Sequence, residues 1–275
     1  MSTVIPILGK PINYGDYTKA EVHVHVVGWF GQKGHIDMGY NSSSVSTCDN
    51  DCELMAARGI KGVNFDYYGP ESMSNVVALR MLAACERSGL QFSICIDSQA
   101  IPKGYSGIQA DQEYARILNF LNDACFSSGS YLTDNGRPVV LFFGEAQGSN
   151  RTSYRALSDN KNMAFVYEGG SGWTAGSDGA FGWVNPVADP TDWNSKAIIS
   201  FNAAAAAKPA MLAFYPTYPG FDDSMAAWGS KRMMSRRLGR TTLDTLALVP
   251  ASAKRVLLAT WDDFEEGTAT KYSQG

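Results

Sequence analysis

Strand-like and helix-like segments alternate along almost the whole chain, and this alternation most constrains how the chain can fold. Eight runs rich in β-branched and aromatic residues are separated by segments with apolar residues at helical spacing. The predicted strands cover residues 22–30, 62–70, 91–97, 137–145, 163–168, 180–185, 210–215 and 255–261. The expected helices cover residues 49–59, 74–89, 111–126, 149–159, 193–207 and 241–250. This order predicts a parallel sheet with right-handed crossover connections.

Eight such units in 275 residues, of which 45% are hydrophobic, match the size and core of a one-domain barrel. We therefore predict that residues 1–275 form a single (β/α)8 barrel, a TIM barrel with eight parallel strands. An open doubly wound sheet is the alternative, but no G-x-G-x-x-G or P-loop motif follows any predicted strand. Only 14 residues follow the last strand, so we expect either that residues 1–20 cover that side of the barrel or that the sequence is truncated after the eighth strand.

The charge pattern restricts the class of partner. The net charge is −4, and the richest basic clusters are 231–232 and 236–240, which argues against a nucleic-acid footprint. No apolar run approaches the ~20 residues that a membrane span needs. Aromatic residues make up 12% of the chain, and several lie in Gly- and Asp-rich loops. Aromatic residues in such loops are either platforms on which sugar rings stack or part of ordinary loop packing. We expect a monomer that binds a carbohydrate, and neither nucleic acid nor a membrane.

The cysteines and histidines do not suggest a metal or another cofactor. The five cysteines fit no zinc or iron–sulfur spacing, and three histidines are few for a metal-dependent hydrolase. Cys48 and Cys52 are one helical turn apart, close enough in principle for a disulfide. His23 and His25 are two residues apart in the first strand and therefore face the same side. They are either core histidines or residues that line the barrel interior. His35, in a Gly-flanked loop, could touch a substrate.

Acidic and aromatic residues gather at the predicted C-terminal strand ends, where barrels of this kind build their active sites. Taken singly, each carboxylate could equally be a helix cap or a solvated charge. Together, carboxylates with few cations nearby raise one another's pKa, as a general acid requires. The residues that we predict to bind substrate are Trp29, Asp66, Tyr67, Tyr68, Glu145, Glu168, Trp183, Tyr215 and Trp261. Asp97, Asp262 and Glu265 also lie at these predicted strand ends.

The segment 261–268, W-D-D-F-E-E-G-T, is the densest of these signals. Asp263 and Glu266 are three residues apart, so a tight turn would direct both side chains to the same side. We predict that these two residues are the catalytic pair, and that Glu265 is dispensable or structural.

Several motifs resemble the barrels of glycoside hydrolase families 71 and 99. They are the Trp-Phe-Gly at 29–31, the stretches 59–70 and 136–143, the Tyr-Pro-Gly-Phe-Asp-Asp at 218–223 and the closing segment 261–268. The resemblance implies a secreted or periplasmic enzyme without a metal, acting on α-linked polysaccharide: α-1,3-glucan in family 71 and α-mannoside in family 99. The closing Asn-Asp-Tyr-Gly-Glu segment of family 71 maps its acid/base carboxylates onto Asp263 and Glu266, with Asp262 where Asn is usual.

The sequence therefore predicts a glycoside hydrolase that cleaves α-glycosidic bonds of an α-glucan or α-mannan with a carboxylate pair. A non-catalytic carbohydrate-binding barrel is the alternative, because it would keep the aromatic platforms without needing that pair. A carboxyl separation of roughly 5 to 10 Å between Asp263 and Glu266 would favour hydrolysis.

Overall fold

The computed structural model describes residues 11–271, which form a closed barrel of eight parallel strands. The neighbouring strands run in the order β3, β2, β1, β11, β8, β7, β6 and β5, and pairing of β3 with β5 closes the barrel. The predicted (β/α)8 fold is thus confirmed. The barrel strands are β1 (Glu21–Val26), β2 (Gly62–Tyr67), β3 (Gln91–Asp97), β5 (Arg137–Phe143), β6 (Ala164–Glu168), β7 (Gly179–Phe181), β8 (Leu212–Thr217) and β11 (Arg255–Leu258).

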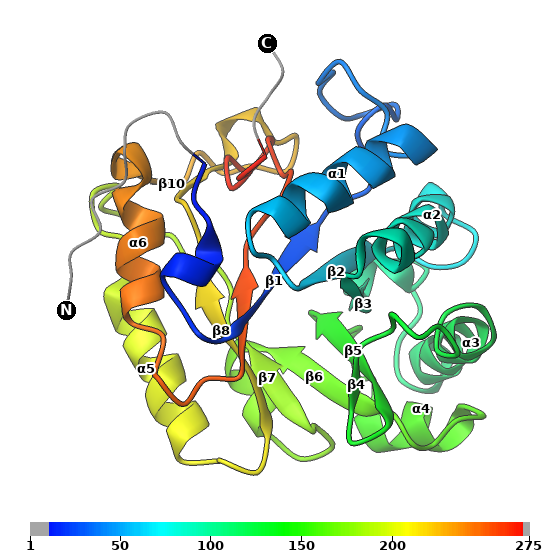
Figure 1. Ribbon diagram of the computed structural model, residues 1–275. Helices are drawn as coiled ribbons and strands as arrows, with labels where there is room; N and C mark the ends of the chain where they lie inside the picture. Colours follow the sequence, from blue (N-terminus) through cyan, green and yellow to red (C-terminus); the bar gives the residue numbers. More distant parts are fainter. Residues whose placement is uncertain (1–10, 272–275) are drawn as a thin grey trace.

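Helices surround the barrel and connect its strands, as Figure 1 shows. They are α1 (Val45–Ala57), α2 (Met73–Ser88), α3 (Ile108–Ala124), α4 (Arg151–Leu157), α5 (Ser195–Ala206) and α6 (Arg240–Ala247). The connection from β6 to β7 carries only the 3-10 turn η3 (Gly169–Trp173). The remaining short elements are η1 (Tyr14–Asp16), η2 (Ser98–Ala100), β4 (Thr133–Asp134), β9 (Phe221–Asp222), η4 (Asp223–Met225), β10 (Met233–Met234) and η5 (Arg237–Gly239).

Within residues 11–271, no helix follows β11. On that side the turn η1 packs in, because Tyr14 is buried and its N–H donates to the carbonyl of Arg58 over 2.8 Å. The expectation that residues 1–20 cover this side thus agrees with the structure for residues 11–20. Residues 1–10 lie outside the described residues.

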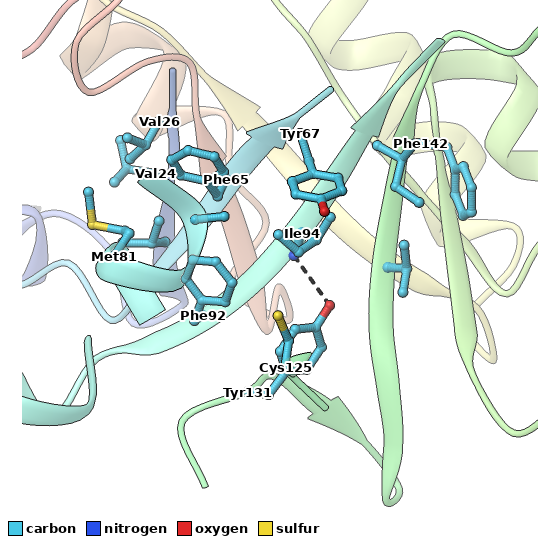
Figure 2. Close-up of a cluster of buried hydrophobic side chains, with 14 of the residues drawn as sticks. Val24, Val26, Phe65, Tyr67, Met81, Phe92, Ile94, Cys125, Tyr131 and Phe142 are labelled. Carbon is cyan, nitrogen blue, oxygen red and sulfur yellow. Dashed lines mark hydrogen bonds between the residues drawn. The ribbon is translucent and has the colours of Figure 1, made fainter. Parts of the chain in front are cut away.

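Each strand alternates between two apolar layers, because successive side chains of a strand point to opposite faces. Figure 2 shows the outer layer, where Val24, Val26, Phe65 and Phe92 gather around Met81 of α2. The inner layer fills the barrel and comprises Cys95, Val139, Leu141, Ala164, Val166, Phe181, Phe214 and Leu257. The same alternation decides which residues at the strand ends can reach a site above the barrel.

Five strands, β1, β2, β5, β7 and β11, end earlier than predicted, and the freed residues build loops. β1 ends at Val26 rather than at Phe30, and β11 ends at Leu258 rather than at Trp261. All five cysteines are buried and free, so the possible Cys48–Cys52 disulfide is not formed.

Candidate functional site

A cavity of about 460 Å³ opens at the C-terminal ends of the strands. Its walls come from the ends of β1, β2, β3 and β5, the loops after β1, β2, β7 and β8, the turn after β3, the start of α2, and the closing segment, residues 259–271, after β11. The cavity brings together six of the predicted site residues: Trp29, Asp66, Tyr68, Trp183, Asp263 and Glu266. The other residues that line the cavity are His25, Val27, Gly28, Gln32, His35, Ser72, Met73, Ser74, Asp97, Gln99, Phe143, Trp228 and Thr260.

The closing segment is a tight loop that Thr260 holds at its base. The hydroxyls of Thr260 and Thr268 lie 3.0 Å apart, and the Asp263 N–H donates to the Thr260 hydroxyl over 2.9 Å. Asp263 Oδ1 in turn accepts from the Glu266 N–H over 2.9 Å. This turn brings Asp263 and Glu266 to the same cavity, as their spacing allows.

Burial in the loop changes the acidity of both carboxyl groups. Asp263 is 4% exposed, and burial, reinforced by the charge of Glu266, raises its pKa to about 7. Burial also raises the pKa of Glu266. The Trp228 indole N–H, which donates to Glu266 Oε1 over 2.9 Å, and the charge of Arg232 oppose that rise. Asp263 is therefore suited to carry a proton near neutral pH, while Glu266 has partners that favour its charged form.

Asp66 and Asp97, at the ends of the neighbouring strands β2 and β3, form a second acidic pair in the cavity. Burial and the charge of Asp97 raise the pKa of Asp66 well above its usual range, although Tyr68 donates its hydroxyl to Asp66 Oδ2 over 2.7 Å. Burial raises the pKa of Asp97 to about 6, against the donation of the Gln99 N–H. Because four carboxyl groups share one cavity, their charged forms disfavour one another.

Two further acidic residues of the closing segment hold the loop after β1. Asp262 Oδ1 accepts from the Val27 N–H over 2.9 Å. Glu265 accepts from His35 Nδ1 over 2.8 Å and from the Ile36 N–H over 3.0 Å. Both carboxylates are 2% exposed and are absent from the cavity lining, so their contacts are structural.

Aromatic rings form one wall of the cavity. The Trp29 ring stacks on His35 with 5.0 Å between ring centroids and 11° between ring planes, and Trp228 meets Trp29 edge-on at 5.8 Å. Trp228, which lies in the connection between β8 and α6, is not among the residues predicted from sequence. The one sequence feature that could have identified Trp228 is its position in a Gly- and Asp-rich loop. Such a wall suits the apolar face of a sugar ring.

Three predicted aromatic residues do not reach the cavity, and placing them there was wrong. Tyr67 follows Asp66 and therefore points outward, where it is fully buried and donates to Asn75 Oδ1 (Figure 2 labels it in the outer layer). Tyr215 also points outward and packs edge-on against Phe201 of α5. Trp261 is 0% exposed and lies beneath the Arg58 guanidinium, because the chain has already left the strand.

Two predicted carboxylates also lie outside the cavity lining. Glu145 pairs with Arg151 and lines a separate hollow with Ser149, Asn150 and Thr174, so the expectation that it shares a cleft with Asp66 was wrong. The chain turns away there, since Gly144 before it has φ of 67°. Glu168 ends β6, where burial and the charge of Asp97 raise its pKa, but it is not among the residues that line the cavity.

In the described part of the chain, no three or more His, Cys, Asp or Glu side chains are grouped so that they could hold a metal ion. None of the helices within residues 11–271 has the length and apolar character needed to cross a bilayer.

The barrel is similar to two solved structures of a glycoside hydrolase family 99 endo-α-mannosidase from Bacteroides thetaiotaomicron, one of them in complex with bis-tris-propane. The TM-scores are 0.73 and 0.72, sequence identity is 13% in both, and the matches cover 92% of this chain and 86% and 87% of the other chains. At this identity the likeness shows the fold, as the resemblance to family 99 implied, and it does not bear on family 71. No family model and no curated protein matches the sequence.

Proposed function

We propose that this protein is a glycoside hydrolase that cleaves α-glycosidic bonds in a polysaccharide. One observation carries the proposal: Asp263 and Glu266 line the same cavity on one tight turn, and the pKa of Asp263 is raised to about 7. Glycoside hydrolysis uses two carboxyl groups, one of which must hold a proton near neutral pH to protonate the leaving oxygen. The family 99 fold of the neighbouring structures supports the same reaction class.

In this proposal Asp263 is the general acid, because it is buried and its pKa lies near the working pH. Glu266 acts as base or nucleophile, because the Trp228 N–H and the charge of Arg232 stabilise its carboxylate. Trp29 and Trp228 stack against the sugar, Trp183 bounds the floor of the cavity, and Asp66 with Tyr68 binds hydroxyl groups.

The substrate class in this proposal is an α-glucan or α-mannan. The two family 99 structures are of an endo-α-mannosidase, which favours an α-mannan as the first substrate to test. The secreted or periplasmic location and the monomeric state that the sequence analysis predicts remain part of the proposal, as does the absence of a nucleic-acid or membrane partner.

The test is a screen of α-mannans, α-glucans and bacterial polysaccharides with detection of newly formed reducing ends. We expect one class to be cleaved by the wild-type protein and not by Asp263→Asn or Glu266→Gln. Glu145→Gln is the matched control, since Glu145 is a carboxylate paired with Arg151 outside the cavity, and it should retain activity. Tight binding of a polysaccharide without any cleavage by the wild-type protein would favour the carbohydrate-binding alternative.

A further inference from the structure

A ladder of polar side chains runs beneath the cavity across three neighbouring strands. His25 of β1, Asn64 of β2 and Ser93 of β3 are partners in strand register, and all three point into the barrel. His25 Nδ1 lies 3.0 Å from Asn64 Oδ1, Asn64 Nδ2 donates to Ser93 Oγ over 3.1 Å, and Ser93 Oγ donates to the Val63 carbonyl over 3.3 Å. His25 is the one member of the ladder that lines the cavity.

The ladder fixes which ring nitrogen of His25 carries the proton. A carbonyl only accepts, so the Ser93 hydroxyl donates to Val63 and accepts from the Asn64 amide. That orientation turns Asn64 Oδ1, also only an acceptor, toward His25 Nδ1, which must therefore carry the hydrogen. Burial lowers the pKa of His25 to about 4, so the ring is neutral near pH 7 and Nε2 has a free lone pair.

The free nitrogen faces another acceptor. His25 Nε2 lies 3.7 Å from Asp66 Oδ1, too far for a hydrogen bond, and Tyr68 donates to the other oxygen, Oδ2. Among residues 11–271, none forms a hydrogen bond with Nε2. Trp183 packs edge-on against the imidazole at 4.8 Å and fixes the orientation of the ring. In the carboxylate form of Asp66, Oδ1 only accepts, so two acceptors lie side by side in the cavity.

We infer that His25 Nε2 and Asp66 Oδ1 accept hydrogen bonds from two adjacent hydroxyl groups of a sugar ring, which makes His25 a positioning and specificity-determining residue. This inference rests on the proposed carbohydrate substrate. Vicinal hydroxyls supply two donors at neighbouring atoms, which matches two neighbouring acceptors. An anionic ligand does not fit, because four carboxyl groups and no Lys or Arg of the described chain line the cavity.

The inference can be tested without turnover by NMR of the ring nitrogens in 15N-labelled protein at pH 7. The chain has only three histidines, and His25→Gln identifies the signals of His25. We expect a protonated Nδ1 and an unprotonated Nε2 in the free protein. Adding D-mannose or D-glucose should move the Nε2 resonance in the direction of a hydrogen-bonded nitrogen. The His23 signals, from a fully buried ring lower in the barrel, are the internal control and should not move.

Deoxy sugars and a second variant sharpen the test. Of a set of monodeoxy sugars, those lacking one of two adjacent hydroxyls should lose the Nε2 shift or bind at least several-fold more weakly. Ser93→Ala frees the Asn64 amide, so we expect a mixture of His25 tautomers and weaker sugar binding in that variant. A protonated Nε2 in the free wild-type protein, or an Nε2 signal that no sugar moves, would overturn the inference.

These outcomes separate the inference from the proposed reaction. A protein that shows the Nε2 signature with sugars but cleaves no polysaccharide would contradict the hydrolase proposal and keep the role of His25. An active hydrolase with a protonated Nε2 would keep the hydrolase proposal and contradict the role of His25.

Discussion

Glu265 Oε2 and His35 Nδ1 lie 2.8 Å apart and connect the closing segment to the loop after β1. Glu265 is 2% exposed, and it also accepts from the Ile36 N–H. The contact places His35 beneath the Trp29 ring, so a residue outside the cavity positions one of its walls.

We therefore predict that Glu265→Ala lowers the free energy of unfolding by about 1–3 kcal/mol, the scale for losing buried hydrogen bonds to a charged group. Sugar binding should weaken as well, because the loop that carries Trp29 and His35 loses its anchor. Urea unfolding and binding titrations measure the two effects. Glu53→Ala, which removes an exposed glutamate of α1, is the control and should change neither. An unchanged free energy of unfolding for Glu265→Ala would show that the contact does not hold the loop.

Tyr67 and Tyr68 are neighbours in sequence that point in opposite directions, and this predicts a clean separation of their roles. Tyr67→Phe loses a hydrogen bond to Asn75 in the outer layer and should cost about 1 kcal/mol of stability, with unchanged hydrolysis. Tyr68→Phe loses the hydrogen bond to Asp66 and should lower hydrolysis with little change in stability. The two variants are compared by urea unfolding and by kcat/KM on the same substrate. Equal activity losses would contradict the assignment.

Trp228 influences Glu266 directly, because its N–H donates to the carboxylate and holds down the pKa of that group. Trp228→Phe keeps an aromatic ring but removes the donor, so the pKa of Glu266 should rise further. If Glu266 must be ionised for catalysis, the acidic limb of the kcat/KM profile moves to higher pH. Trp173→Phe, which changes a ring packed on Phe201 away from the cavity, is the control. A profile that does not move would separate Trp228 from the titration of Glu266.

The raised pKa of Asp263 also predicts how stability depends on pH. The folded protein holds this proton up to a pH of about 7, whereas an unfolded chain releases it near pH 4. The folded state therefore binds more protons between these values, and stability falls as the pH rises through this window. Asp263→Asn removes this dependence, since Asn Oδ1 can still accept the Glu266 N–H. The variant should gain stability relative to wild type from pH 4 to 8, by at most about 4 kcal/mol for a shift of roughly three pKa units.

Urea unfolding of both proteins at pH 4.5 and pH 8 measures this difference. Asp97 and Glu168, whose raised pKa values do not depend on Asp263, change the stability of both proteins alike. The charge of Asp263 also raises the pKa of Asp66, so the difference reports Asp263 together with its effect on that neighbour. A difference that stays constant with pH would show that the pKa of Asp263 is not raised in the folded state.

Much of the barrel was predictable from sequence because its strands are buried on both faces and its helices have amphipathic spacing. The strand ends were less predictable. Trp29 and Trp261 continue apolar runs, yet β1 and β11 stop three residues before them. Without that boundary, the burial of Trp261 beneath Arg58 could not be foreseen.

The candidate site was predictable where alternation could be applied. Asp66 and Asp97 point inward because residues two positions earlier, Asn64 and Cys95, do so, and the same rule excludes Tyr67 and Tyr215. Trp228 was beyond prediction, because no pattern in the connection between β8 and α6 places it over the cavity. Glu145 was misplaced because its partner Arg151, six residues later, follows a turn whose direction depends on Gly144.

The central claim is that Asp263 protonates the leaving oxygen, and the dependence of the rate on the leaving group tests it most directly. The measurement compares wild type and Asp263→Asn on two substrates of the sugar found in the screen: the polysaccharide and an aryl glycoside with a strongly acidic phenol. The variant should lose about 10²-fold or more in turnover on the polysaccharide, the scale of lost general acid catalysis. It should lose far less on the aryl glycoside, whose leaving group needs no proton. Equal losses on both substrates, or full activity on the polysaccharide, would contradict the account.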